Sequence, residues 1–157
     1  MRKIKTYGII MLLFIMGTAF AEVKFYGNES AVRKVLIATE NTRYKNRLIN
    51  ELIEKIDDGA TYIVEVDHQR DGLDDMDPRE FTAVFISNSG AQAMVRPNVM
   101  SWLESYRDYD DNVILHTTQI TEWDPPVKVD SITSASKMSN IDDLTNDIVN
   151  RIRRFFE

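Results

Sequence analysis

Cysteine is absent from this sequence of 157 residues, and histidine occurs only twice. The lack of cysteine excludes a disulfide scaffold, a cysteine-ligated zinc site, an iron–sulfur cluster, a thiol nucleophile and a lipid-anchored cysteine behind a leader. Glycine and proline are also few, with six and four residues. The remaining composition, 43% hydrophobic and 28% charged, is typical of a globular domain with a core large enough to fold independently.

Basic residues are outnumbered by acidic ones, 19 to 25, and the formal net charge is −6. Domains that bind nucleic acids are usually basic, with lysine and arginine residues clustered on one face. The charge balance therefore argues against a nucleic-acid partner.

The first 21 residues have the pattern of a secretory signal peptide. A basic start at 1–5 leads into a mostly apolar run at 8–16, and the segment ends with the small-residue pattern Ala19-Phe20-Ala21. An uncleaved membrane anchor is the alternative, but the apolar run is shorter than the roughly 20 residues that a membrane span needs. We therefore expect cleavage after Ala21, export to the periplasm or the cell exterior, and no membrane span after cleavage.

Strand and helix patterns alternate after a short polar lead-in at 22–32, and we expect one domain at 33–157. Buried strands are predicted within 32–39, 62–66, 81–86, 112–118 and 127–133. Apolar residues at helical spacing predict helices that follow the first, third and fifth of these strands. The pattern predicts an α/β fold, a three-layer sandwich with a five-stranded parallel sheet covered on both faces.

The stretch 81–103 resembles the middle of a flavodoxin. A buried strand ends in the loop Ser87-Asn88-Ser89-Gly90, and the following segment has a small residue and methionine before Pro97, Val99 and Leu103. By element order the resemblance extends over about 33–157. It implies the strand order 2-1-3-4-5, bound FMN, electron transfer and a redox partner protein.

The resemblance also implies a ligand site at the carboxyl ends of the first, third and fourth strands. Loop amides and helix N-termini at such an edge favour anions. Trp123, in the loop after the fourth strand, is the best-placed aromatic residue for stacking on a flavin. The candidate cofactor-binding residues are Thr39, Asn41, Thr42, Ser87, Asn88, Ser89, Gly90, Thr118 and Trp123.

The segment 39–44 departs from the phosphate loop of that family. Flavodoxins have Ser/Thr-x-Thr-Gly-x-Thr here, whereas this chain has Thr39-Glu40-Asn41-Thr42-Arg43-Tyr44. Thr42 replaces the glycine, and Glu40 places a negative charge close to the position of a phosphate, which Arg43 or Lys45 can compensate. The alternative is an ordinary strand-to-helix turn capped by Asn41 or Thr42.

The segment 130–136 resembles a motif of exported FMN-binding proteins, Asp-Gly/Ala-x-Ser/Thr-Gly-Ala-Thr/Ser. In that family FMN is joined to the last residue by a phosphoester, so the resemblance implies covalent attachment at Ser136. Asp130, Thr133 and Ala135 match the motif, and Ser134 replaces its glycine. The alternative is an ordinary Ser/Thr-rich connection between a strand and a helix.

Three function classes follow from these observations. The first is an exported flavodoxin-like electron carrier that binds FMN, and the second is a binding or assembly module that kept the fold and lost the cofactor. The third is a hydrolase that uses Ser87 or Ser89 with His116, although no acid partner is identifiable in the sequence. The acidic residues at 67–77 lack the ligand spacing of a calcium loop and predict a solvated loop.

Overall fold

The computed structural model describes residues 23–70, 72–90, 94–121 and 124–157. The expected signal peptide and Trp123 therefore lie outside the described residues. Within the described ranges, no helix combines the length and the apolar character needed to cross a membrane.

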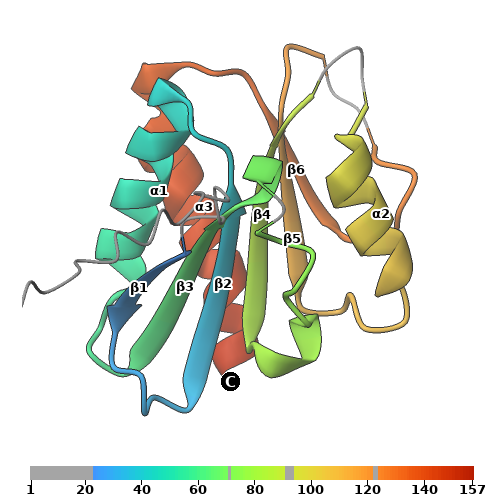
Figure 1. Ribbon diagram of the computed structural model, residues 1–157. Helices are drawn as coiled ribbons and strands as arrows, with labels where there is room; N and C mark the ends of the chain where they lie inside the picture. The colour runs from blue at the N-terminus through green and yellow to red at the C-terminus, as the bar shows by residue number, and fades with distance from the viewer. Residues whose placement is uncertain (1–22, 71, 91–93, 122–123) are drawn as a thin grey trace, which may run out of the picture.

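Six strands form one mixed sheet in the order β1-β3-β2-β4-β5-β6 (Figure 1). The strands are β1 (Val23–Gly27), β2 (Arg33–Thr39), β3 (Thr61–Asp67), β4 (Ala83–Ser89), β5 (Val113–Thr118) and β6 (Asp130–Ser134). The helices are α1 (Arg43–Ile56), α2 (Pro97–Ser105) and α3 (Ile141–Arg153).

The structure corrects the expected strand number, and the additional strand changes the order of the whole sheet. The polar lead-in contains β1, which pairs antiparallel with β3 and adds an edge strand to the sheet. Val23 packs on one core cluster and Tyr26 on the other, so this short strand alternates between the two faces of the sheet. The other five strands run parallel as β3-β2-β4-β5-β6, with β2 in a central position.

Helix α1 forms where the apolar spacing predicts it. Thr42 is the N-cap, and its hydroxyl oxygen accepts a hydrogen bond from the Lys45 amide at 3.2 Å. Leu48, Leu52 and Ile56 are buried at helical spacing and pack on the sheet. The cap fixes the first turn of α1 directly after β2, at the edge where the candidate site is expected.

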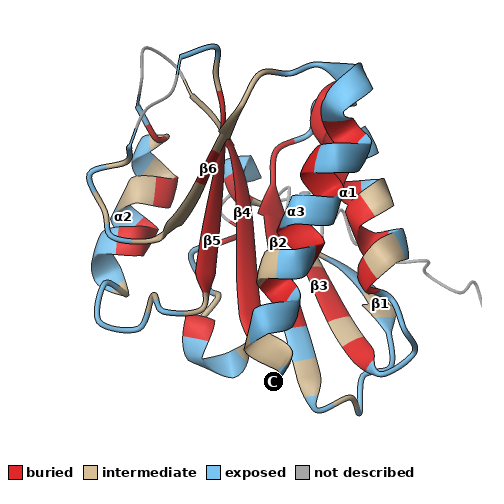
Figure 2. Ribbon diagram, turned by 180° about the vertical axis from the view of Figure 1, so that it is seen from behind, coloured by how far each residue is buried: buried red, intermediate tan, exposed pale blue. Residues whose placement is uncertain are grey.

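The sheet is covered on both faces, as expected for a three-layer sandwich. Figure 1 shows α1 and α3 on one face and α2 on the other, and Figure 2 shows the buried inner sides of α1 and α3. The two core clusters lie on opposite sides of the sheet. The described residues of the connection from β3 to β4 form only short 3-10 helices, at His68–Arg70 and Pro78–Glu80, in agreement with the predicted loop.

Candidate functional site

The carboxyl ends of the parallel strands meet at one edge of the sheet. The register aligns Thr39 with Asp67 and Ser89 with Thr118, and Thr118 in turn with Ser134. The loops after β2, β4, β5 and β6 therefore bring polar residues that are far apart in the sequence to the same edge (Figure 1).

Glu40, the first residue after β2, is the centre of a buried polar cluster at this edge. Its side chain is only 1% exposed. Lys45 Nζ lies 3.1 Å from Oε1, and Gln69 Nε2 donates to Oε2 at 2.9 Å. Arg96 forms an ion pair with Oε2 at 3.1 Å, and the side chain of Ser89 also hydrogen-bonds to Glu40. Side chains from four other segments of the chain thus surround the carboxylate, and Oε1 is held by the charge of Lys45 without a hydrogen-bond partner among the described residues.

The electrostatics keep this carboxylate ionised. Burial alone raises the pKa of Glu40, but the hydrogen bond from Ser89 and the charges of Lys45 and Arg96 outweigh burial and hold that pKa below its usual value. For Lys45, burial has the opposite effect and lowers the pKa to about 8, although the negative charge of Glu40 acts to raise it. At neutral pH the two side chains form a buried ion pair.

A chain of hydrogen bonds continues from Lys45 across the sheet. Lys45 Nζ donates to Ser87 Oγ at 3.0 Å, and Ser87 Oγ lies 3.0 Å from His116 Nδ1. His116 Nε2 lies 2.8 Å from Ser134 Oγ. Since Ser87 accepts from a cation, its own proton is directed to Nδ1, and a neutral His116 then donates from Nε2 to Ser134.

Both histidines at this edge are buried and held neutral. Burial and, to a smaller extent, the nearby charge of Lys45 lower the pKa of His116 to about 3. Burial also lowers the pKa of His68, although its hydrogen bond to the Ser87 carbonyl, at 3.1 Å, opposes the change. Neither side chain carries a charge at neutral pH.

The predicted residues of the first loop do not form a phosphate cradle in this structure. Thr42 is the N-cap of α1, and the Asn41 side chain accepts a hydrogen bond from Asn46 at 2.8 Å. Thr39 and Asn41 border a cavity of about 150 Å³ on the side of β1 and β3. The loop is therefore the capped strand-to-helix turn that the sequence offered as the alternative.

The predicted loop residues Ser87, Asn88 and Ser89 are the last residues of β4, and they serve the buried cluster. Ser87 is fully buried and bonds to Lys45, and Ser89 bonds to Glu40. The buried Asn88 accepts a hydrogen bond from the Arg96 amide at 3.1 Å, which fixes the approach to α2. Ser87 and Ser89 lie on one face of the sheet and Asn88 lies on the other, because successive side chains of a strand alternate between its faces.

Three predicted residues do meet around one cavity. Gly90, Thr118 and Ser136 line a cavity of about 640 Å³ at the ends of β4, β5 and β6. Thr118 Oγ1 and Gln119 Nε2 are buried there, and neither has a hydrogen-bond partner among the residues that the structure describes. The complete lining is Gly90, Thr118, Gln119, Ile120, Thr121, Ala135, Ser136 and Lys137.

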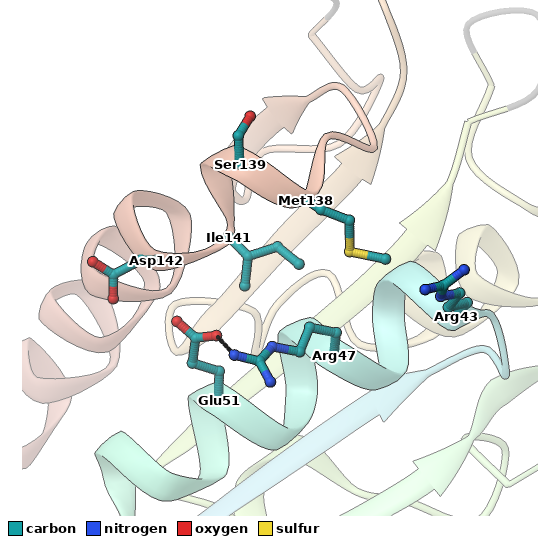
Figure 3. A pocket seen from close by; sticks show the side chains of 7 residues that line it. All are labelled: Arg43, Arg47, Glu51, Met138, Ser139, Ile141 and Asp142. Carbon is teal, nitrogen blue, oxygen red and sulfur yellow. Dashed lines mark ion pairs between the residues drawn. The ribbon is translucent and has the colours of Figure 1, made fainter.

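A second cavity, of about 360 Å³, lies between the first turns of α1 and α3 (Figure 3). Figure 3 shows Met138 and Ile141 above it and Arg43 beside it, with the ion pair between Arg47 and Glu51 below. This cavity contains none of the predicted site residues and lies on a helical face away from the strand ends. The edge cavity is therefore the better candidate site.

The residues at the start of α1 do not fit the phosphate of FMN. An anion site needs donors that have no partner, and here Lys45, Gln69 and Arg96 are bound to Glu40. A phosphate at this position would face the Glu40 carboxylate.

The structure brings together the Ser87 and His116 of the hydrolase hypothesis, but both side chains are fully buried. A substrate could not reach the Ser87 hydroxyl in this arrangement. In the described part of the acidic loop, as elsewhere in the described residues, no group of three or more candidate side chains could hold a metal ion.

Gln69 and Arg96 are the residues of this site to which sequence reasoning gave no role, whereas it named Lys45 beside Arg43 as a counter-charge of Glu40. Gln69 and Arg96 lie 29 and 56 residues from Glu40 in the chain. The only available signal was the acidic residue in the first loop, with Lys45 as a possible counter-charge. The pairing itself depends on the way in which the sheet assembles.

No family model matches the chain, and no curated protein matches it. Among solved structures, a flavodiiron protein from Giardia intestinalis matches with a TM-score of 0.56 and 12% identity over 80% of this chain. The Flv1 flavodiiron core from Synechocystis sp. PCC6803 matches with a TM-score of 0.56 and 5% identity over 81%. The lysine decarboxylase LdcF from Francisella novicida matches with a TM-score of 0.52 and 8% identity over 79%.

These similarities show a flavodoxin-like α/β fold. The chain covers 37% of the Giardia protein, 36% of the Synechocystis protein and 17% of the Francisella protein. Flavodiiron proteins and a lysine decarboxylase thus contain regions of the same fold. The fold alone therefore does not determine which ligand is bound. The residues at the carboxyl edge of the sheet determine it.

Proposed function

We propose that this chain is a flavodoxin-like binding module that takes up a small ligand at the carboxyl edge of its sheet without recognising a phosphate. The observation that carries this proposal is the buried Glu40 carboxylate, which occupies the cations at the start of α1. A module of this kind keeps the fold but has no anion site for FMN in its first loop.

The proposed ligand site is the edge cavity. Its volume of about 640 Å³ lies within the range of about 300–1,000 Å³ that small-molecule sites usually have. Thr121, Ser136 and Lys137 supply polar side chains, and Ile120, at 96% exposed, supplies apolar surface. This lining suits a small, partly apolar ligand with a few hydrogen-bonding groups.

Flavin-based electron transfer is the second candidate, with FMN attached to Ser136 and a redox partner protein. Ser136 is exposed, and it lines the same cavity as Gly90 and Thr118. A phosphoester at this residue makes a noncovalent phosphate cradle unnecessary. The fold shared with flavodiiron proteins is compatible with this candidate but does not select it.

An absorbance scan and an intact mass, both on protein purified from its native host, separate the two candidates. A colourless protein without a flavin-sized mass increment supports the binding module. A flavin band, together with an FMN-sized increment that disappears in Ser136→Ala, supports the second candidate. Flavin that is released on denaturation contradicts both, because it requires a noncovalent FMN site.

The binding module has a test of its own. A molecule that copurifies with the wild-type protein should be identified by mass spectrometry and should be lost in Ser136→Trp, which fills the edge cavity. Ser139→Trp is the matched control, because it places the same side chain in the cavity between α1 and α3. Equal retention of the molecule in both variants contradicts the proposed location.

We also propose that the protein is exported through the leader at 1–21, which supports a role outside the cytoplasm. The measurement is the N-terminal residue of the protein recovered from the exported fraction of its host. A chain that begins at Glu22 supports the proposal, and a chain that retains Met1 in the cytoplasm contradicts it.

A further inference from the structure

We propose that Lys45, in the first turn of α1, and Arg96, directly before α2, form a carboxylate-binding site whose ligand is supplied by the chain itself, the side chain of Glu40. A free carboxylate such as acetate would occupy this site when the Glu40 side chain is removed. The site is separate from the edge cavity, so the proposal does not depend on the ligand of that cavity.

The donors around Glu40 come from different parts of the fold and point at the same two oxygens. Lys45 Nζ approaches Oε1 at 3.1 Å. Gln69 Nε2 approaches Oε2 at 2.9 Å, and the Arg96 guanidinium approaches Oε2 with Nε at 3.2 Å and with a terminal nitrogen at 3.1 Å. Two cations and an amide thus surround a single carboxylate, which is the donor set of a carboxylate-binding site.

The donors should stay in place when the Glu40 side chain is removed. Lys45 is fixed independently by Ser87, whose Oγ lies 3.0 Å from Nζ, and the Arg96 backbone is fixed by Asn88. Lys45 is also buried, with 1% of its side chain exposed, so its ammonium would lose its counter-charge away from water. A buried unpaired charge is costly, so the variant either takes up an anion from solution or loses the Lys45 proton, and a pH well below 8 favours the anion.

The entrance to this site is at Arg96. Its side chain is 40% exposed, whereas those of Glu40 and Lys45 are each 1% exposed. In the wild-type protein the Glu40 side chain fills the space between these cations and excludes anions from solution. A small carboxylate can enter past Arg96 once that side chain is absent.

The test is thermal unfolding of Glu40→Gly with acetate or chloride as the added anion, at equal ionic strength. A site with a dissociation constant near 10 mM predicts that about 100 mM acetate raises the Tm of the variant by roughly 4 °C over chloride. The wild-type protein should show no such difference. The double variant Glu40→Gly, Lys45→Met should lose the effect of acetate.

Glu51→Ala is the matched control. It removes a carboxylate that also lies beside two cations, Arg47 at 3.3 Å and Lys55 at 3.7 Å, but these cations are more exposed than Lys45, 68% and 26% against 1%. Acetate should not stabilise this variant. An equal effect of acetate on the wild-type protein, on Glu51→Ala or on the double variant would overturn the proposal, since it would indicate a general ion effect.

A second measurement applies if Glu40→Gly does not fold in chloride. The variant is then refolded from urea in acetate and in chloride, and the recovery is followed by circular dichroism. Recovery in acetate alone supports the proposal. Failure to recover in both salts overturns it, as does a folded variant whose Tm does not depend on acetate.

Discussion

Replacement of Lys45 by methionine is the perturbation that probes the buried cluster most deeply. The two side chains are similar in length, so Lys45→Met removes the charge and leaves little empty space. The variant leaves the Glu40 carboxylate buried with Gln69 and the half-exposed Arg96, and it removes the donor to Ser87. Breaking a buried ion pair by the removal of one partner costs about 3–5 kcal/mol.

The expected loss can be measured by urea unfolding followed by circular dichroism. For a chain of this size, each kcal/mol corresponds to roughly 2–4 °C in Tm, so a decrease of roughly 10 °C is expected. Glu40→Gln should also destabilise the protein. Their double variant should lose less than the sum of the two single losses, because the second substitution removes a charge that the first has left unpaired.

Two results would refute this reasoning. A loss below about 1 kcal/mol for Lys45→Met would mean that the pair contributes no more than an exposed ion pair does. Additive losses in the double variant would mean that the two side chains do not interact. Either result would also remove the basis for the carboxylate-binding site around Glu40.

Three further predictions concern other parts of the fold. Burial lowers the pKa of His116 to about 3, so between about pH 6.5 and 3 the unfolded chain binds a proton that the folded chain does not. Acidification over this range should therefore lower the free energy of unfolding of the wild-type protein by up to about 1.4 kcal/mol per pH unit more than that of His116→Gln. Urea unfolding at several pH values measures this difference. Thr42→Ala removes the cap of α1 and should lower the free energy of unfolding by about 1 kcal/mol, whereas Thr42→Ser keeps the hydroxyl and should leave it almost unchanged. Equal decreases in urea titrations would contradict the cap. Gly27→Ala should lower the Tm by more than Gly59→Ala does. Both glycines have a positive φ, +77° and +73°, but of the two only Gly27 would bring the added Cβ against a backbone atom, 2.1 Å from the Thr61 oxygen. Equal decreases in Tm would contradict the close approach of β1 and β3.

The fold was largely predictable because its signals are local. The helices at Arg43–Ile56 and Ile141–Arg153 follow the apolar spacing of their own residues, and the parallel strands follow short apolar runs. The strand Val23–Gly27 was missed, since only five residues with one exposed aromatic side chain carry its alternation. Its place in the sheet is decided by pairing with β3, about 40 residues away.

The candidate site was predictable only as an edge of the sheet. Sequence order places Gly90, Thr118 and Ser136 at the ends of strands, and the structure gathers all three around one cavity. The burial of Glu40 could not be read from the sequence, since an acidic residue in a loop is usually solvated. It becomes buried because Lys45 and Arg96 reach it from α1 and from the loop before α2.

The most direct test of the central claim compares the affinities of the apo protein for FMN and riboflavin, measured by quenching of flavin fluorescence. The two molecules differ only in the phosphate, so the ratio of their dissociation constants isolates its recognition. Because Glu40 already occupies the cations at the start of α1, we predict equal affinities or no binding of either molecule. If FMN binds more than about tenfold more tightly, a gain of about 1.4 kcal/mol, a phosphate site exists and the account is contradicted.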